Sequence, residues 1–178
     1  MIRFTLDGKP VEARAGETIF AVARREGVAI PHLCHRDAPG YRPDGNCRAC
    51  VVEIASARAL APSCHREPAE GMVVSTTSAR AEAARRGVFE LLAADMPARE
   101  ASPDPASRFW TQAEALGLAA SRYPARLADP RAAGLALHDA SHVAIAVNLD
   151  ACIACGLCAR ACREVQINDV LGMGGRGA

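Results

Sequence analysis

The sequence lacks the features that would direct a chain to a membrane or to nucleic acid. No apolar stretch approaches the length of a membrane span, and the first residues, MIRFTLDGKPVEAR, hold no apolar run flanked by positive charge. Lys9 is the only lysine, the arginines are scattered, and the formal net charge is +1, so no basic patch is evident. These absences predict a cytoplasmic protein with no membrane span and no nucleic-acid partner.

The common catalytic motifs are missing as well. The sequence contains no P-loop, no nucleophile elbow and no phosphate cradle, and we therefore assign no catalytic residue. What it does contain is cysteine, eight residues in a chain of 178. Because the cytoplasm keeps thiols reduced, cysteine clusters there bind metal more often than they form disulfides.

Residues 1–78 begin with the pattern of a β-hairpin. The alternation in IRFTL predicts a strand at 2–6 with its apolar side chains on one face. Asp7-Gly8 is a strong hairpin turn signal, and VEARA at 11–15 is expected to return as the second strand.

A helix and further short strands should complete this domain. ETIFAVARREG, residues 17–27, shows a helical apolar stripe, and Gly27 stands where a left-handed cap belongs. Three more strands are expected, at 51–54, 59–63 and 72–76. A hairpin, one helix and later strands predict an α+β fold for residues 1–78.

Residues 79–142 contain no cysteine and are predicted to be a helical linker. Ser78 can cap a helix that starts at Ala79, with a buried face formed by Ala84, Val88, Leu91 and Leu92. A second helix is expected over 104–117, with Phe109-Trp110 as packing residues.

The end of the linker is predicted from its prolines and its polarity. The stretch 121–134 is punctuated by proline and indicates a connector. HDASH, residues 138–142, is expected to be a surface loop that leads into a strand over 142–150. The remaining segment, 143–178, then carries the second group of cysteines.

The first cysteine set consists of Cys34, Cys47, Cys50 and Cys64, in the spacing C-x12-C-x2-C-x13-C. A C-x2-C pair can hold one iron, and two outlying cysteines can hold a second, in the order found in plant-type [2Fe–2S] proteins. Gly40, Gly45 and Ala49 would let backbone amides approach the cluster. Structural zinc is the alternative, although zinc sites often use two C-x2-C pairs and only one is present.

Three histidines, His32, His35 and His65, flank these cysteines. A Rieske-type centre would use two histidines in place of two cysteines. Because four cysteines are available, we interpret the histidines as loop residues and not as ligands.

The second cysteine set consists of Cys152, Cys155, Cys158 and Cys162, in the spacing C-x2-C-x2-C-x3-C. This is the bacterial [4Fe–4S] pattern, in which the fourth cysteine binds the other cluster of a two-cluster ferredoxin. No second run follows before Ala178. Either Cys162 closes a single cluster, or the ferredoxin-like domain at 143–178 is truncated; we favour truncation.

Three stretches together resemble a known module: IPHLCHRDAPGYRPDGNCRACVVEI, APSC and VNLDACIACGLCARACREVQINDVLGM. They are similar to the N-terminal iron–sulfur segment of NAD-linked, molybdopterin-dependent formate dehydrogenase alpha subunits. Related segments occur in the large iron–sulfur subunit of NADH dehydrogenase and in NAD-reducing hydrogenases. The resemblance implies a [2Fe–2S] cluster on the first cysteine set in a β-grasp ferredoxin domain. It also implies a [4Fe–4S] cluster on the second set, with Cys162 serving a further cluster.

The resemblance implies an electron-transfer role and its partners. Single electrons would pass between a flavin/NAD-binding, diaphorase-type subunit and a molybdopterin catalytic domain or subunit. Many relatives carry an intermediate cluster bound by one histidine and three cysteines; residues 65–151 contain no cysteine, so we expect none here. Two alternatives stay open: an iron–sulfur subunit of a hydrogenase or NADH dehydrogenase, and a zinc-stabilised interaction module without a redox role.

Overall fold

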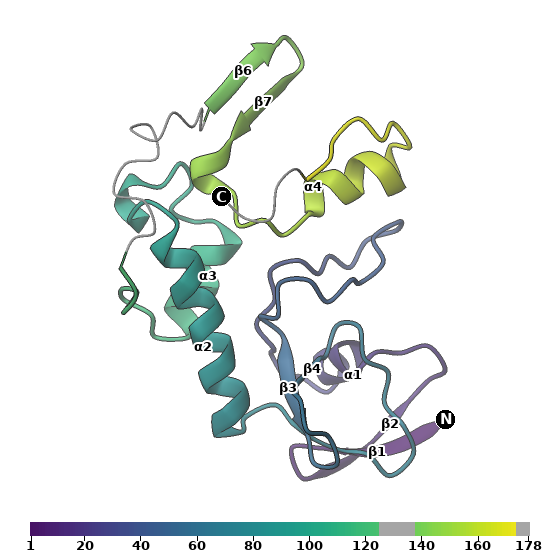
Figure 1. The fold of residues 1–178 in the computed structure, drawn as a ribbon. Coiled ribbons are helices and arrows are strands. Elements are labelled where there is room, and N and C mark those ends of the chain that lie inside the picture. The colour runs from purple at the N-terminus through teal and green to yellow at the C-terminus, as the bar shows by residue number, and fades with distance from the viewer. Residues whose placement is uncertain (125–137, 174–178) are drawn as a thin grey trace. The chain divides into compact units, whose positions relative to one another are not determined.

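The computed structural model describes residues 1–124 and 138–173 (Figure 1). The chain divides into two compact units. Unit 1 contains Met1–Arg85 together with the chain from Cys155 onward, and unit 2 contains Arg86–Ala154. Within the described ranges, no helix has both the length and the apolar character needed to cross a bilayer.

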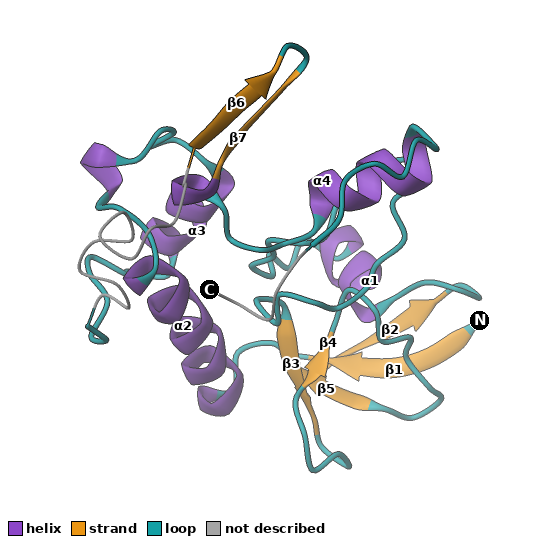
Figure 2. Cartoon of the chain, turned by 45° about the horizontal axis from the view of Figure 1, so that its top comes forward, coloured by secondary structure: helices purple, strands orange, loops and turns teal. Residues whose placement is uncertain are grey.

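Unit 1 is built on a five-stranded mixed sheet in the order β2-β1-β5-β3-β4 (Figure 2). The strands are β1 (Ile2–Leu6), β2 (Lys9–Ala13), β3 (Val51–Ile54), β4 (Ala61–Pro62) and β5 (Val73–Ser75). β1 pairs with β2 and β3 pairs with β4 in antiparallel fashion, whereas β1 and β5 are parallel neighbours. All five strands lie where the sequence predicted them, within two or three residues at their ends.

The hairpin turn between β1 and β2 follows from its two residues. Asp7 has φ 49° and Gly8 has φ 79°, the pair of positive angles that a tight two-residue hairpin requires. The Asp7 carboxylate also accepts hydrogen bonds from the Thr76 backbone N–H and hydroxyl, each 2.6 Å long. The turn is thereby tied to the residue that follows β5.

Helix α1 (Ile19–Arg25) supplies the other half of the core. The Thr18 side chain caps its first turn by accepting a hydrogen bond from the Ala21 N–H at 3.2 Å. Gly27 follows the end of the helix in the left-handed conformation, with φ 78°, as predicted. One core cluster joins buried side chains of the sheet and of α1, among them Phe4, Leu6, Ile19, Phe20, Val22, Val52, Ile54 and Val74. The α+β expectation for this part of the chain is confirmed.

Helix α2 (Ala79–Ala94) begins at the predicted cap, since the Ser78 hydroxyl accepts the Ala81 N–H at 3.2 Å. Its predicted buried face is wrong in part, because Ala84, Val88 and Leu92 are only half-buried and Leu91 is exposed. The residues buried along it are Ala81, Arg85, Phe89 and Glu90, whereas Leu91 is 55% exposed. The error arose because the true stripe carries charged residues, which an apolar pattern does not count.

Unit 2 has its own small core between α2 and α3 (Arg108–Ala115). Phe89 stacks on Phe109 with ring centroids 5.5 Å apart, and Trp110 meets Phe109 edge-on at 4.9 Å. A 3-10 turn, η1 (Arg99–Ala101), lies between the two helices in the chain. Phe109 and Trp110 are therefore packing residues, as the sequence predicted.

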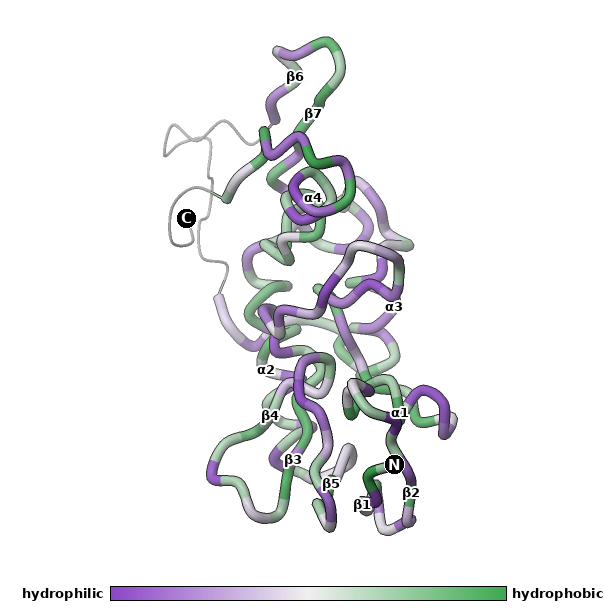
Figure 3. Tube along the Cα trace, turned by 90° about the vertical axis from the view of Figure 1, so that its right-hand side faces the viewer, coloured by the Kyte–Doolittle hydropathy of each residue, from purple (hydrophilic) through white to green (hydrophobic). Residues whose placement is uncertain are grey.

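The last part of unit 2 is a two-stranded hairpin of β6 (His138–His142) and β7 (Ile145–Asn148). HDASH was expected to be a loop, and this expectation is wrong, because its backbone pairs with β7 despite its polar side chains. The hairpin exposes apolar residues, including Val143, Ile145 and Val147. Figure 3 shows the hydrophobic, green colour in the turn of this hairpin. Most of the predicted connector, residues 125–134, lies outside the described residues.

Short helical turns surround the second cysteine set. η2 (Leu149–Ala151) precedes Cys152, and α4 (Leu157–Arg160) runs directly into a π-helical turn, η3 (Ala161–Val165). The boundary between the two units falls within this set, so that Cys152 belongs to unit 2 and the other three cysteines to unit 1.

Candidate metal centre

The first cysteine set is assembled by the β3–β4 hairpin and the loop that precedes it. Cys50 comes directly before β3 and Cys64 follows β4 by two residues, so pairing of Val51 with Pro62 brings the two cysteines together. The Ser63 backbone N–H donates to the Cys50 carbonyl at 3.2 Å, and the Ser63 hydroxyl donates to the same oxygen at 2.7 Å.

The loop brings the other two cysteines to the same place. The Cys34 N–H donates to the Cys47 sulfur, and the Cys47 N–H donates to the Cys34 sulfur, both at 3.4 Å. Cys34, Cys50 and Cys64 are buried and Cys47 is half-buried. The structure thus gathers all four cysteines of the first set, and none of the eight cysteines forms a disulfide.

The four sulfurs are close enough to control one another's protonation. Hydrogen bonds from the Cys47 and Cys64 side chains lower the pKa of Cys34 to about 2. A hydrogen bond from Cys64 lowers the pKa of Cys50 to about 6. Cys64, which donates to both Cys34 and Cys50, has a raised pKa, and contact with Cys34 raises the pKa of Cys47. Neighbouring thiolates repel one another, so four sulfurs this close lose their protons together only beside strong positive charge. Iron supplies that charge when a cluster is bound.

Backbone geometry around Cys47 points amides at the sulfurs. Arg48 adopts φ 58°, and the Ala49 N–H then donates to the Cys47 sulfur at 3.4 Å. Gly45, with φ 62°, allows the loop to pass close to Pro62 of β4. Amide donors of this kind stabilise thiolate ligands and tune the reduction potential of a cluster.

These residues fit a two-iron cluster. Among residues 1–124 and 138–173, no three histidine, cysteine, aspartate or glutamate side chains are grouped as ligands of one metal ion. The sulfurs of the first set meet in three contacts, Cys34 with Cys47, Cys34 with Cys64, and Cys50 with Cys64. The C-x2-C pair, Cys47 and Cys50, which was expected to hold one iron, is not among them. A [2Fe–2S] cluster takes two thiolates on each iron, and the contacts of Cys34 with Cys47 and of Cys50 with Cys64 suit this arrangement.

The flanking histidines contribute packing. His32 and His35 each meet the Phe20 ring of α1 edge-on, with centroids 4.8 and 4.7 Å apart. Burial, followed by the nearby His32, lowers the pKa of His35. His65 lies within hydrogen-bonding distance of the Pro43 carbonyl, at 3.3 Å. These contacts agree with the interpretation of the three histidines as loop residues.

The second cysteine set is less gathered. Cys152 and Cys158 are exposed, Cys155 is half-buried and Cys162 is buried. The Cys152 sulfur accepts the Ala154 N–H at 3.4 Å, and the Cys162 sulfur accepts the Val170 N–H at 3.3 Å. Cys162 stands in the π-helical turn η3, a local distortion that is frequent at functional sites. The ligand assignment of this set stays a prediction.

Sequence reasoning missed two arginines that adjoin the first cysteine set. Arg85 of α2 and Arg160 of α4 are only 5% and 4% exposed. The Arg85 Nε–H donates to the Val51 carbonyl at 2.9 Å, and Arg160 donates to the carbonyls of Cys34 and Arg42. The position of Arg160 between Cys158 and Cys162 was the available signal, but arginine on a helix ordinarily faces water.

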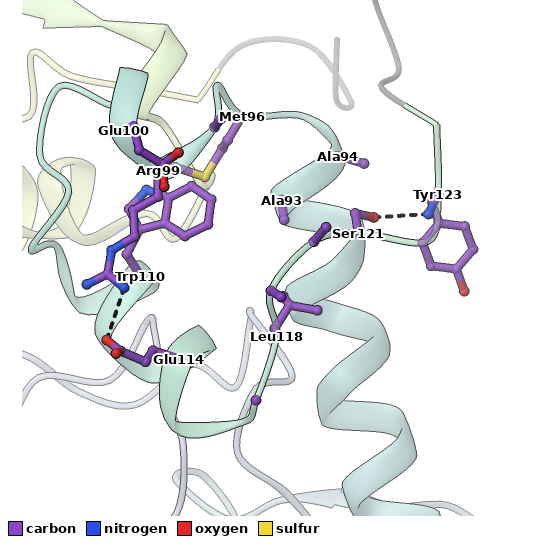
Figure 4. A pocket seen from close by; sticks show the side chains of 14 residues that line it. Ala93, Ala94, Met96, Arg99, Glu100, Trp110, Glu114, Leu118, Ser121 and Tyr123 are labelled. Carbon is purple, nitrogen blue, oxygen red and sulfur yellow. Dashed lines mark hydrogen bonds and ion pairs between the residues drawn. The ribbon is translucent and has the colours of Figure 1, made fainter.

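A pocket in unit 2 is lined mainly by α2, α3 and the residues that follow α3 (Figure 4). Met96, Trp110 and Leu118 line it, and Arg99 forms an ion pair with Glu114 at its edge, 3.0 Å long. These side chains do not form a recognisable nucleophile, base or metal-ligand group. That the chain has no catalytic residue stays a prediction.

Comparison with known protein families gives one match over each cysteine set. Residues 1–79 match the 2Fe-2S iron-sulfur cluster binding domain, and residues 145–167 match the 4Fe-4S binding domain. The predicted cofactors and the predicted fold class are thereby confirmed at the level of these domains. The matched models name iron–sulfur clusters, so the zinc-stabilised alternative loses its support.

Similar proteins are subunits of redox complexes. An NADH-quinone oxidoreductase subunit of Rhizobium meliloti is 32% identical over 93% of this chain and 19% of its own length. The NADP-reducing hydrogenase subunit HndD of Solidesulfovibrio fructosivorans is 33% identical over 99% of this chain. The chain thus spans about a fifth of the first relative and 30% of the second.

A solved structure is similar to this chain over nearly its whole length. A chain in the crystal structure of NAD+-reducing [NiFe]-hydrogenase in the H2-reduced state superposes with a TM-score of 0.81 at 29% identity. The match covers 99% of this chain and 71% of that one. The formate dehydrogenase assignment stays a prediction. The chain contains a 2Fe-2S binding domain followed by a 4Fe-4S binding domain, and it is similar to the iron–sulfur segment of NADH-quinone oxidoreductase and NAD-reducing hydrogenase subunits.

Proposed function

We propose that this chain passes single electrons between a flavin/NAD-binding partner and a catalytic centre of the same complex, of the NADH dehydrogenase or NAD-reducing hydrogenase type. The main observation in support of the proposal is that four cysteines lie close together in a largely buried region: Cys34, Cys47, Cys50 and Cys64. Iron–sulfur clusters, when bound, accept and release one electron at a time, with plant-type clusters near about −400 mV.

The residues of unit 1 would perform distinct tasks at the [2Fe–2S] site. The four cysteines of the first set hold the irons. The Ala49 amide and the amides of Cys34 and Cys47 hydrogen-bond to the ligand sulfurs. Ser63 fixes the Cys50 carbonyl and so the start of β3. Burial by α1 and the sheet keeps water from the sulfurs, which protects the thiolates from oxidation.

The second cysteine set would hold a [4Fe–4S] cluster. We assign Cys152, Cys155 and Cys158 as its ligands, with Cys162 as its fourth ligand or as a ligand to a further cluster. A second site in the same chain gives electrons an onward step. The two-electron chemistry of a nicotinamide partner is thereby connected to single-electron transfer.

Reciprocal substitutions test these assignments. Anaerobically prepared Cys47→Ser protein, reduced with dithionite, should lose the [2Fe–2S] EPR signal and keep the [4Fe–4S] signal. Cys155→Ser should show the opposite pattern, so each variant is the control for the other. If both signals are unchanged in Cys47→Ser, the assignment of the first cysteine set as cluster ligands is rejected. A colourless protein with stoichiometric zinc and no acid-labile sulfide would overturn the electron-transfer proposal as a whole.

A formate dehydrogenase-type complex is the second candidate, favoured by the three sequence stretches that resemble its alpha subunit. Both candidates use the same eight cysteines and differ in the catalytic partner, which in this case is a molybdopterin domain or subunit. The native complex distinguishes them by its electron donor. NADH should reduce viologen in either case, because both candidates share the flavin/NAD-binding partner. Viologen reduction with hydrogen, or quinone reduction with NADH, without formate activity supports the first candidate, and viologen reduction with formate, together with bound molybdenum, supports the second.

A further inference from the structure

Arg85 is a buried cation beside the first cysteine set. It is 5% exposed, its Nε–H is bound to the Val51 carbonyl, and its Nη2 has no hydrogen-bond partner within the described residues. Val51 adjoins Cys50. Burial lowers the pKa of Arg85, and the negative charges of a Cys50 thiolate and of the Glu82 and Asp7 carboxylates oppose this shift. Among the described residues no carboxylate forms an ion pair with Arg85, and a guanidinium without such a partner is costly to bury.

Arg160 is a second buried cation, on the Cys34 side of the same set. It is 4% exposed, and its guanidinium donates to the Arg42 carbonyl at 2.7 Å and to the Cys34 carbonyl. Within the described residues its Nε has no hydrogen bond; the Asp44 carboxylate lies 3.5 Å away and is partly exposed, and the charge of Glu164 also interacts with that of Arg160. Asp44 therefore compensates this charge only in part.

A bound cluster supplies the missing negative charge. Four thiolates and two sulfides carry more negative charge than two ferric ions carry positive charge, and reduction adds one electron without breaking a bond. We propose that Arg85 and Arg160 are positioning residues that supply the buried counter-charge of the [2Fe–2S] cluster and favour its reduced state. The proposal rests on the cysteine assignment made above.

Replacement of either arginine by glutamine should make the [2Fe–2S] cluster harder to reduce. At a fixed electrode potential we expect the ratio of reduced to oxidised cluster to fall about tenfold. This is the size expected from one charge about 10 Å away at an effective dielectric constant of about 20. Tenfold corresponds to about 59 mV for one electron. An EPR-monitored redox titration of the full chain measures this ratio.

Two further variants separate charge from structure. Arg85→Lys and Arg160→Lys keep the charge and should restore most of the wild-type ratio, although lysine cannot reproduce the guanidinium contacts. Arg42→Gln is the matched control, because its side chain is 78% exposed on the same loop and its charge is screened by water. We expect this control to change the ratio less than twofold.

The stability of the protein gives a second measurement. In cluster-free protein Arg85→Met removes a buried charge that Cys50, Glu82 and Asp7 compensate only in part, so this variant should unfold at a higher temperature than cluster-free wild type. Cluster loading should then raise the unfolding temperature less in the variant than in wild type.

The outcomes are distinguishable. If the wild type and both glutamine variants contain the cluster, but the ratio of reduced to oxidised cluster in the variants stays within twofold of the wild-type ratio, the arginine proposal is overturned. The electron-transfer function is left intact by this result. Equal gains in unfolding temperature on loading of wild type and Arg85→Met overturn it too. Failure of wild-type protein to hold any iron and acid-labile sulfide rejects the proposed function instead.

Discussion

Gly45 lies where the first cysteine loop passes close to Pro62 of strand β4. Its φ is 62°, and a Cβ built on it would lie 3.2 Å from Pro62 Cγ and 3.5 Å from His65 Cβ. Gly45→Ala therefore introduces two separate costs. The left-handed backbone costs about 1 kcal/mol for a residue with a side chain, and the contact adds about 1 kcal/mol because the proline ring cannot rotate away.

A total of about 2 kcal/mol should lower the unfolding temperature of the loaded protein by roughly 4–8 °C, at 2–4 °C for each kcal/mol. Gly8→Ala is the matched control. Gly8 has φ 79° and nothing within 4 Å of an added Cβ, so it carries the backbone cost alone and a shift of roughly 2–4 °C. Calorimetry of both variants at one protein concentration and scan rate measures the difference.

The difference between the two variants isolates the approach of the loop to β4. We also expect Gly45→Ala to retain less iron after gel filtration, because the loop that carries Cys47 must shift away from Cys64. If Gly45→Ala lowers the unfolding temperature no more than Gly8→Ala does, the close packing of this loop on Pro62 is refuted.

Two further predictions concern helix α2. Ser78→Ala removes the cap and should cost about 1 kcal/mol, seen as a drop of roughly 2–4 °C in unfolding temperature, whereas the exposed neighbour Thr77→Ala should change little. Phe89→Ala should cost about 3–5 kcal/mol, because Phe89 is fully buried and stacks on Phe109; Leu91→Ala, 55% exposed on the same helix, should cost far less. Equal losses for Phe89→Ala and Leu91→Ala would contradict the observed buried face, and equal losses for Ser78→Ala and Thr77→Ala would contradict the cap.

Local signals accounted for most of unit 1. The alternation of IRFTL, the Asp7-Gly8 turn and the Gly27 cap act within a few residues, so they can be interpreted without knowledge of the rest of the fold. The parallel pairing of β1 with β5 could not be predicted in this way. It joins Thr5 to Val73, and no short sequence pattern encodes such a distant neighbour.

The limits of sequence reasoning were set by polar residues in unexpected places. The polar side chains of HDASH concealed strand β6, which exists because its backbone pairs with β7. In the same way Arg85 concealed the buried face of α2. At the candidate site, spacing identified the four cysteines of the first set. The buried arginines depend on tertiary packing and could be recognised only in the fold.

The parallel pairing of β1 with β5 also constrains the order of events during synthesis. The first strand emerges from the ribosome long before its partner at Val73–Ser75, and every cysteine of the first set is translated between them. Such non-local pairing is slow to form, because a long loop must close first. Until it forms, reactive thiols are open to oxidants. We expect the four thiols to be most accessible, both to oxidants and to incoming iron and sulfide, before the sheet has closed around the site.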